Sequence, residues 1–342
     1  MKAFRILFFG SALAFLFLSV ANAQHVVKAF EQKHFPTTVP AGNYSGITHL
    51  HDDVYAVVSD KSDSSLYFNF RIQLDSLTGD LRHVECLGGV GHVDTCGLDH
   101  EAIAKVSDST LVIASEGLFR FTEYPIESPT QGLWSMRKPV ADFYPNYGYE
   151  SLTYDSVRHC LWSITESTLR KDGKPASWQN GESNRLRLFA FDKTGTRASY
   201  AYQMDAPSTN KAAQMYVMGV SELCALPDGQ LLVLEREAWI PKIKIGAFCR
   251  CKLYMVNPSQ EKEFAMTDAF SSDTPFVRKR LLTEWTTKLS LLGRSFANYE
   301  GMCLGPRLAN GDWVLILLAD SQNQYAGVLR DWFKTIVISP SN

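Results

Sequence analysis

The sequence lacks the motifs of most hydrolases that act through a nucleophilic side chain. It has no Gly-x-Ser-x-Gly segment, which excludes a serine-hydrolase elbow. His100-Glu101 has no second histidine at Ala104, so a zinc-peptidase helix is excluded, and there is no Gly-rich phosphate loop. After His159-Cys160, Glu166 stands where a cysteine phosphatase carries arginine. The hydrolytic route that remains is a metal-activated water.

The sequence also has no surplus of positive charge. Without its first 23 residues the chain carries 32 basic and 36 acidic residues, a net charge of −4. Nucleic-acid binding needs a basic surface, so we expect no nucleic-acid partner.

The one long apolar run lies at the N-terminus. Lys2 and Arg5 precede an apolar stretch over 6–20, and Ala21-Asn22-Ala23 follows as a small-residue cleavage site. This order is typical of a secretion signal over 1–23, cut between Ala23 and Gln24. We therefore expect an exported protein, periplasmic or secreted, with no membrane span after cleavage. An uncleaved anchor is the alternative.

No Pro/Ser-rich linker or low-complexity tract divides the rest, so 24–342 is predicted to form one domain. We also expect this domain to be a monomer. A pattern recurs five times along it: an opening polar residue starts one apolar strand, and an acid closes the next. The opening positions are Ser45, Glu101, Glu150, Glu222 and Glu300, and the closing acids are Asp60, Glu116, Glu166, Glu235 and Asp320. Such repetition indicates stacked supersecondary units.

Each repeat is predicted to contain four short strands. In the fourth, the strand over 222–226 meets the turn Pro227-Asp228-Gly229, and strands over 231–234, 252–256 and 280–286 follow. No amphipathic helix is evident, so the fold class is all-β. Four-stranded units in a ring form a β-propeller; five blades are favoured and six remain open. We expect 26–33 to pair with 334–339 and close the ring.

The repeat predicts that the acids meet. The start of the first strand and the end of the second lie at the same end of a hairpin, so both acids of each repeat share one face. The first strand lines the central channel, so the carboxylates are expected around its mouth. Carboxylates held close together must protonate, pair with a base or bind a cation. Ca²⁺, which prefers several oxygen ligands, is the predicted cofactor. Its candidate ligands are Asp60, Glu101, Glu150, Glu222, Glu300 and Asp320.

Basic residues are expected above this ring. The loops that follow the second strands carry lysines and arginines, and 238–250 contains no acid. Lys and Arg bind phosphate oxygens through charge-assisted hydrogen bonds, so a small phosphorylated substrate is the predicted partner. The candidate phosphate-binding residues are Lys61, Arg236, Lys242 and Lys244, and Glu222 or Glu235 is the candidate general base.

Three segments resemble a known family. The segment over 298–308 with Ala319-Asp320-Ser321 resembles the last repeat of the phytase-like, "esterase-like activity of phytase" family of exported bacterial proteins. The segment over 219–236 resembles its central repeat, and Ser45-Gly46-Ile47 with Ser59-Asp60-Lys61 its opening one. The name of the family implies hydrolysis of phosphate or other esters, by analogy with calcium-dependent β-propeller phytases. Lys61 stands where the family commonly has arginine, which keeps the charge but loses the bidentate fork.

Two other functions fit the same pattern. The glutamates could accept backbone N–H bonds from the neighbouring blade in a non-catalytic ligand-binding or interaction propeller of the cell envelope. Alternatively, a lactonase-like calcium propeller would use the ring on carbon esters and would not need the basic loops.

Overall fold

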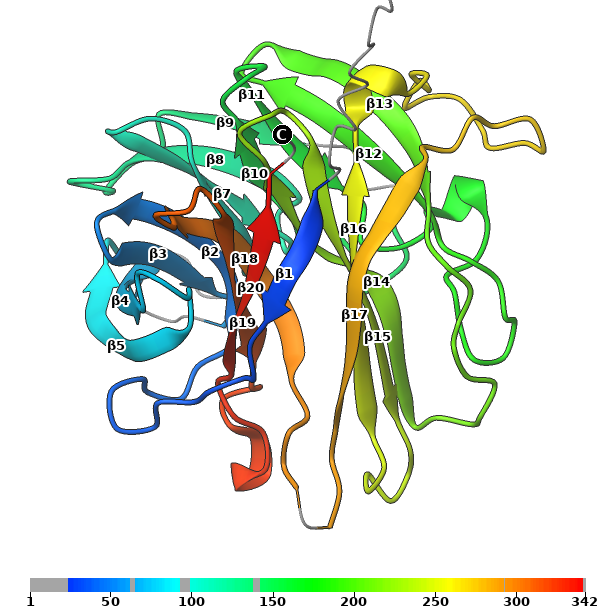
Figure 1. Cartoon of the computed structure of the whole chain (residues 1–342). Helices are drawn as coiled ribbons and strands as arrows, with labels where there is room; N and C mark the ends of the chain where they lie inside the picture. Colours follow the sequence, from blue (N-terminus) through cyan, green and yellow to red (C-terminus); the bar gives the residue numbers. More distant parts are fainter. Residues whose placement is uncertain (1–23, 62–64, 93–98, 138–141, 292, 341–342) are drawn as a thin grey trace, which may run out of the picture.

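The computed structural model describes residues 24–61, 65–92, 99–137, 142–291 and 293–340. The predicted secretion signal lies outside these residues. Within them the chain forms five antiparallel sheets of four strands each (Figure 1). The all-β propeller is therefore confirmed with five blades. No helix among the described residues is long and apolar enough to cross a membrane.

In blades 1 to 4 the strands follow the chain from one edge of the sheet to the other. Blade 1 contains β2 (Tyr44–His51), β3 (Val54–Ser59), β4 (Tyr67–Leu74) and β5 (Leu81–Val90). Blade 2 contains β6 (His100–Lys105), β7 (Thr110–Ser115), β8 (Arg120–Pro125) and β9 (Trp134–Arg137). Blade 3 contains β10 (Thr153–Asp155), β11 (Cys160–Ile164), β12 (Arg185–Asp192) and β13 (Gly195–Gln203).

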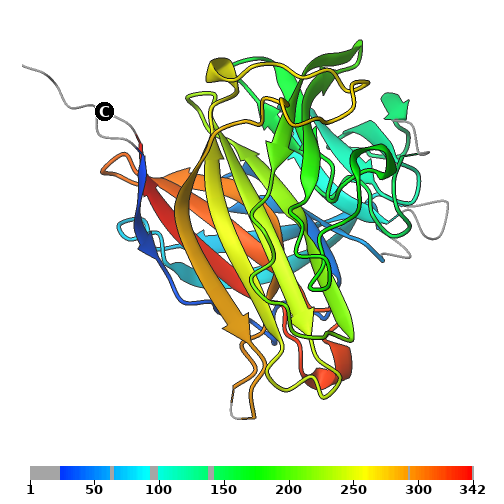
Figure 2. The same cartoon turned by 90° about the vertical axis from the view of Figure 1, so that its right-hand side faces the viewer.

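Blade 4 is the longest, with β14 (Met215–Ala225), β15 (Leu231–Ile240), β16 (Phe248–Val256) and β17 (Lys279–Lys288). Its lower end projects beyond the other blades in Figures 1 and 2. Blade 5 contains β18 (Asn298–Arg307), β19 (Trp313–Asp320) and β20 (Phe333–Ser339). In the described part of the chain the loops contain three single-turn 3₁₀ helices: η1 (Arg170–Asp172), η2 (Pro258–Gln260) and η3 (Tyr325–Gly327).

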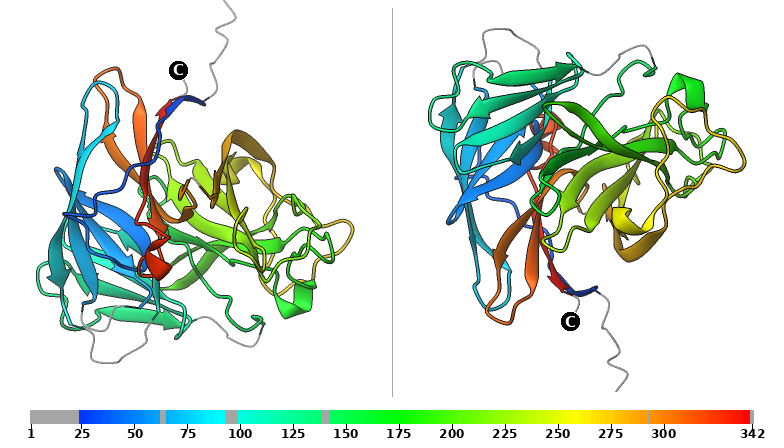
Figure 3. Two further views of the ribbon diagram at one scale, coloured as in Figure 1. Left: turned by 90° about the horizontal axis from the view of Figure 1, so that it is seen from below. Right: turned by 90° about the horizontal axis from the view of Figure 1, so that it is seen from above.

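The N-terminal strand closes the ring. β1 (His25–Ala29) adds antiparallel to β20, with His25 opposite Ser339, and completes blade 5 (Figure 1). This confirms the predicted pairing of the two ends of the domain. Figure 3 shows the blades from both ends, in the colour order of the sequence. Closure pairs an edge that would otherwise expose unpaired backbone groups.

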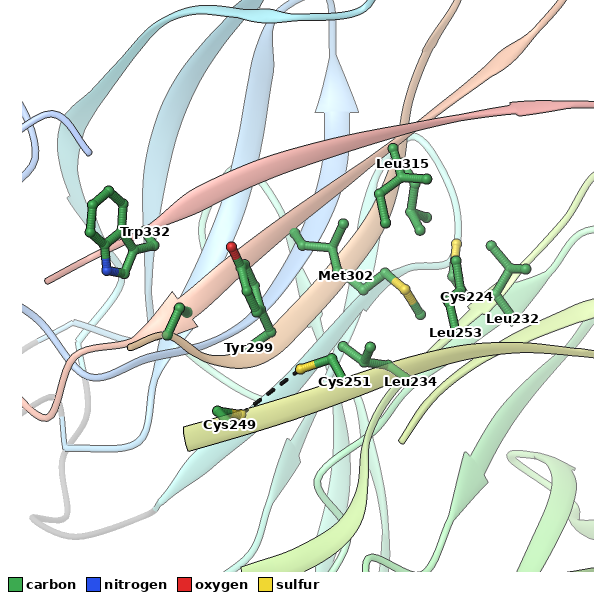
Figure 4. Close-up of a cluster of buried hydrophobic side chains, with 14 of the residues drawn as sticks. Cys224, Leu232, Leu234, Cys249, Cys251, Leu253, Tyr299, Met302, Leu315 and Trp332 are labelled. Atoms are coloured by element: carbon green, nitrogen blue, oxygen red, sulfur yellow. Dashed lines mark hydrogen bonds between the residues drawn. The ribbon is translucent and has the colours of Figure 1, made fainter. Parts of the chain in front are cut away.

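The first strands of the blades pack around the axis. β2, β6, β10, β14 and β18 contact one another in turn around the ring. Two glycines allow this approach: a Cβ added to Gly46 would lie 2.7 Å from the Ala102 Cα, and one added to Gly301 would lie 2.9 Å from the Ser45 carbonyl oxygen. Apolar side chains fill the wedges between blades. Figure 4 shows the cluster between blades 4 and 5, where Cys249, Tyr299 and Leu315 are buried.

Candidate functional site: an acidic ring at the channel mouth

The inner hairpins share one register, which defines the ring. In blades 1 to 3 the N–H of the closing residue donates to the carbonyl two residues before the opening position: Asp60 to Asn43 (3.0 Å), Glu116 to Asp99 (2.8 Å) and Glu166 to Gly148 (3.1 Å). In blade 5, Asp320 pairs with Asn298, again two residues before Glu300. The register therefore places Ser45, Glu101, Glu150 and Glu300 at equivalent positions.

Blade 4 differs from the prediction by one residue. Arg236 pairs with Gly219, so the equivalent opening residue is Ser221 and the closing residue is Arg236 itself. The expected placement of Glu222 and Glu235 in the ring is therefore wrong. Adjacent residues of a strand point to opposite faces, so a shift of one residue turns both glutamates away from the ring. The ring loses two acids and gains a guanidinium.

Glu222 instead links two blades. Its Oε1 accepts hydrogen bonds from the backbone N–H of Leu152 in the neighbouring blade (3.0 Å) and from Leu223 (2.9 Å). The side chain is fully buried, and this burial raises its pKa well above the usual value. This is the structural alternative that the sequence left open, and it does not support a role for Glu222 as metal ligand or general base.

Glu235 belongs to a separate polar cluster between blades 3 and 4. Its Oε1 accepts hydrogen bonds from the Tyr202 hydroxyl (2.7 Å) and from the Lys279 ammonium (2.5 Å). Lys279 also pairs with Asp205 at 2.9 Å. These partners hold the Glu235 carboxylate at 3% exposure, so it is not placed to accept a proton at the channel mouth.

Arg236 pairs with three ring acids. Its Nη2 lies 3.2 Å from both Glu150 and Glu166, and its Nη1 lies 2.5 Å from Glu300. The side chain is 4% exposed. Arg236 therefore neutralises the part of the ring formed by blades 3 and 5. Because carboxylates already occupy its guanidinium, the structure does not present it to a phosphate group as the sequence analysis expected.

Burial and mutual repulsion make the ring acids weak. Burial raises the pKa of Glu150 and of Glu300 to about 7, because its effect is larger than the opposing effect of the Arg236 charge. Burial, with repulsion from Glu150 and Glu300, raises the pKa of Glu101 well above its usual value. The pKa of Glu166 rises in the same way, by burial and then by repulsion from Glu150. The single positive charge of Arg236 does not balance the negative charges of these four carboxylates.

The opposite part of the ring holds a possible metal site. Asp60, Asp99 and Glu101 each offer a carboxylate oxygen, and these oxygens lie within 4.8 Å of one another. Asp99 adopts a left-handed backbone with φ of 44°, a conformation that non-glycine residues adopt where the surrounding structure requires it. Asp60 Oδ1 and the nearby Glu116 Oε1 are buried and have no hydrogen-bond partner among the described residues. This acidic triad could hold a metal ion.

Asp320 closes the ring in blade 5 but is engaged by its own loop. It accepts a hydrogen bond from the Gln322 backbone N–H at 2.7 Å and another from the Gln322 side-chain amide. Gln322, Asn323 and Gln324 all have positive φ values between 51° and 53°. Consecutive left-handed residues other than glycine are rare and cluster at functional sites. This turn carries Gln322 and Asn323 over the mouth of the ring.

A hollow of about 520 Å³ opens above the triad. Its lining consists of Asn43, Asp60, Lys61, Asp99, Gln322, Asn323 and Tyr325. Lys61 is more than half exposed and pairs with Asp60 at 2.5 Å. The site therefore combines acids at its base with one ammonium group, amides and a phenol.

The other predicted basic residues lie outside this hollow. The Lys244 ammonium contacts the Tyr325 hydroxyl at 3.1 Å, at the edge of the site, and Lys242 is exposed on the turn between β15 and β16. Asp99 and Tyr325 were not predicted from the sequence as site residues. Asp99 directly precedes His100-Glu101, and that adjacency to a ring acid was the signal available for it.

The comparison with known families agrees with this architecture. The sequence model described as "Phytase-like: Esterase-like activity of phytase" matches residues 39–322, which include every ring residue. The chain belongs to this phytase-like family. No curated protein matches the chain. The family assignment confirms the resemblance found in the three segments, and its name suggests an esterase or phosphatase activity without specifying one.

Several solved structures match most of the chain at low identity and low TM-score. A streptogramin B lyase is 12% identical, with a TM-score of 0.36 over 91% of this chain and 98% of the lyase. A luciferin-regenerating enzyme is 9% identical, with a TM-score of 0.41 over 90% of this chain and 95% of that enzyme. A PQQ-bound aldose sugar dehydrogenase from Streptomyces coelicolor is 12% identical, with a TM-score of 0.40 over 92% and 100% of the two chains.

Proposed function

We propose that this protein is an exported hydrolase of small phosphate esters that depends on a divalent cation, with Ca²⁺ as the favoured ion. The observation that carries the proposal is that Asp60 and Asp99, two members of the acidic triad with Glu101, line a hollow that Lys61 also lines. Carboxylates that can bind a cation and a lysine that can bind a phosphate group therefore lie within one site.

The residues of the triad fit a hard cation. All its donor atoms are carboxylate oxygens, the ligands that Ca²⁺ prefers, and Ca²⁺ tolerates an irregular arrangement of them. Two carboxylates about 5 Å apart repel by about 3 kcal/mol at an effective dielectric constant near 20. Asp60 Oδ1 and Glu116 Oε1 add oxygens that no donor among the described residues satisfies. Asp60, Asp99 and Glu101 would hold the ion, and Glu116 would lie beside it.

A cation bound there would polarise a phosphoryl group and make a water more acidic. The chain's own residues have the remaining roles. The Lys61 ammonium would bind the phosphate oxygens and offset the charge that develops on them. Gln322 and Asn323 would orient the ester through their amides. The ammonium group of Lys61 is a point charge and cannot bind two phosphate oxygens as the planar fork of arginine does. The side-chain amides and the Tyr325 hydroxyl would therefore supply the directional hydrogen bonds to the substrate.

Glu116 replaces Glu222 and Glu235 as the proposed proton acceptor. Burial, followed by repulsion from Asp99 and Asp60, raises its pKa above the usual value. A base with a pKa closer to neutrality accepts a proton from water more readily than an ordinary carboxylate does. Its unpartnered Oε1 leaves an oxygen available for that proton.

The test is a panel of phosphate esters and carboxylic esters, incubated with the mature chain after chelation and again after Ca²⁺ is restored. We expect phosphate ester hydrolysis that requires Ca²⁺ and is lost in Asp99→Asn and Glu116→Gln. Glu222→Gln serves as the control, because that side chain lies outside the ring. A folded wild-type protein that binds Ca²⁺ and hydrolyses no phosphate ester would overturn the proposal.

A further inference from the structure

The face that carries the acidic ring also carries a cluster of exposed apolar side chains. Among the described residues, five of the eleven large apolar side chains that are exposed lie at the start of β14, in the loops at the same end of blade 4, and in η3. They are Met215, Ile243, Ile245, Leu291 and Tyr325. Ile243 is 79% exposed and Leu291 is 81% exposed. We call these five residues and their loops the apolar platform.

Contacts between loops make the platform one surface. The Gly246 N–H donates to the Leu289 carbonyl at 2.7 Å, and the Leu289 N–H donates to the Ala247 carbonyl at 2.9 Å. Lys244 contacts the Tyr325 hydroxyl at 3.1 Å, and the Arg294 guanidinium donates to the Gly327 carbonyl at 3.0 Å. Figures 1 and 2 show these loops side by side where they project from the lower end of the molecule.

The loops of blade 4 that carry the platform contain basic residues and no acidic ones, while Glu284, Asp60 and Asp99 lie at its borders. The segments 206–215, 238–247 and 287–297 contain no acidic residue. Their basic residues are Lys211, Lys242, Lys244, Lys288 and Arg294, all of them exposed. On the turn between β15 and β16, lysines alternate with the two isoleucines as Lys242-Ile243-Lys244-Ile245. A protein with a slight overall negative charge thus concentrates positive charge around its exposed apolar side chains.

We propose that the apolar platform docks on the surface of an anionic lipid bilayer. Exposed apolar side chains can enter the boundary between headgroups and acyl chains, while lysines and arginines beside them attract anionic headgroups. Trp239 and Phe248 stack at the base of the same turn, with ring centroids 5.6 Å apart, and aromatic side chains favour that boundary. A protein partner would need acidic residues to match five cations, whereas anionic lipid supplies that charge at every point of its surface.

Docking does not depend on the proposed hydrolase activity. The platform borders the hollow through Tyr325, so a docked molecule would hold the channel mouth close to the bilayer. The basic loop residues, which the sequence analysis assigned to a soluble phosphate ester, would instead contact lipid headgroups. The platform uses none of the ring acids, so lipid binding is expected in the presence of a chelator.

The test is sedimentation of the mature chain with lipid vesicles at low salt with EDTA. One set of vesicles contains only phosphatidylcholine, and the other contains about 30% phosphatidylglycerol, which supplies the negative surface potential. We expect binding to the anionic vesicles, reduced at high salt. The double substitution Ile243→Ser/Ile245→Ser should weaken it by about tenfold or more, since two apolar contacts are lost. Lys242→Gln/Lys244→Gln should weaken binding and reduce its salt dependence.

Leu77→Ser is the matched control. Leu77 is 77% exposed on the turn between β4 and β5, at the opposite end of the blades from the platform. It should bind vesicles as the wild type does, and thermal melts would verify that every variant is folded. The proposal is overturned if the wild type ignores anionic vesicles or if Leu77→Ser loses as much binding as the platform variants. A third outcome also overturns it: the wild type is a dimer in gel filtration and does not bind vesicles, and Ile243→Ser/Ile245→Ser is a monomer. The platform would then be an interface between two copies of the chain.

Discussion

Replacing Arg236 with methionine removes the counter-ion of three ring carboxylates, of which Glu166 is buried and Glu150 and Glu300 are partly exposed. The guanidinium is 4% exposed and lies within 3.2 Å of Glu150, Glu166 and Glu300. Methionine retains much of the apolar stem, so the principal loss is charge. Removing one partner of a buried ionic group destabilises a protein by about 3–5 kcal/mol. For a domain of this size, that corresponds to a fall of about 4–8 °C in the melting temperature at pH 7.5 without divalent cations.

The assay is calorimetric melting of chelated protein at two pH values. At pH 5 Glu150 and Glu300, whose pKa values are about 7, are largely protonated and need no counter-ion, so the effect of Arg236→Met should shrink. Added Ca²⁺ at pH 7.5 should also recover part of the loss, because a cation can replace the missing charge.

Arg187→Met is the matched control for this prediction. Arg187 is 1% exposed and pairs with Asp172 through two hydrogen bonds of 2.8 and 2.6 Å, away from the ring. Its loss should destabilise the protein without any recovery by Ca²⁺. If Arg236→Met melts like the wild type, or if its loss is as insensitive to Ca²⁺ as that of Arg187→Met, the account of Arg236 as the counter-ion of the ring is refuted.

Three further predictions concern single features of the site. Glu222→Ala leaves the Leu152 N–H without its acceptor, so urea denaturation should show that the free energy of unfolding falls by about 1–3 kcal/mol. The affinity for Ca²⁺ should stay within twofold of wild type, and a large loss of Ca²⁺ binding would show that Glu222 takes part in the metal site. Glu150 and Glu300 have pKa values of about 7 in the folded protein, against an ordinary value of 4.5. The folded state therefore holds more protons than the unfolded state between these values, and the stability of the chelated protein should fall as pH rises from about 4.5 to about 7; a melting temperature that rises across this window would contradict the shifts. Lys61→Met should raise KM for phosphate esters by about tenfold and change stability by less than about 0.5 kcal/mol; an unchanged KM in steady-state kinetics would remove Lys61 from substrate binding.

The repeat pattern was sufficient to predict the blades and most of the ring. Strand periodicity and turn residues fix where each hairpin starts, and equivalent hairpin ends meet on one face, so Asp60, Glu101, Glu150 and Glu300 were placed correctly at the channel mouth. These placements need only local patterns and the closure of the sheet ring.

Blade 4 shows what such patterns do not determine. Ser221-Glu222 and Glu235-Arg236 are each two polar residues in succession. Glu222 and Glu235 were predicted to lie in the ring because they are acidic, but Ser221 and Arg236 occupy those positions. The deciding signal is Gly219, which lies two residues before Ser221 as Gly148 lies two before Glu150. The hydrogen bond from Leu152 to Glu222 joins residues 70 positions apart, and no local pattern encodes such a contact.

Calorimetric titration of the chelated protein with Ca²⁺ tests the central claim most directly. The account predicts saturable binding in the wild type, a large loss of affinity in Asp99→Asn, and unchanged affinity in Glu222→Gln. An absence of Ca²⁺ binding by folded wild-type protein, or equal binding by Asp99→Asn, would show that the part of the ring formed by blades 1 and 2 is not a cation site.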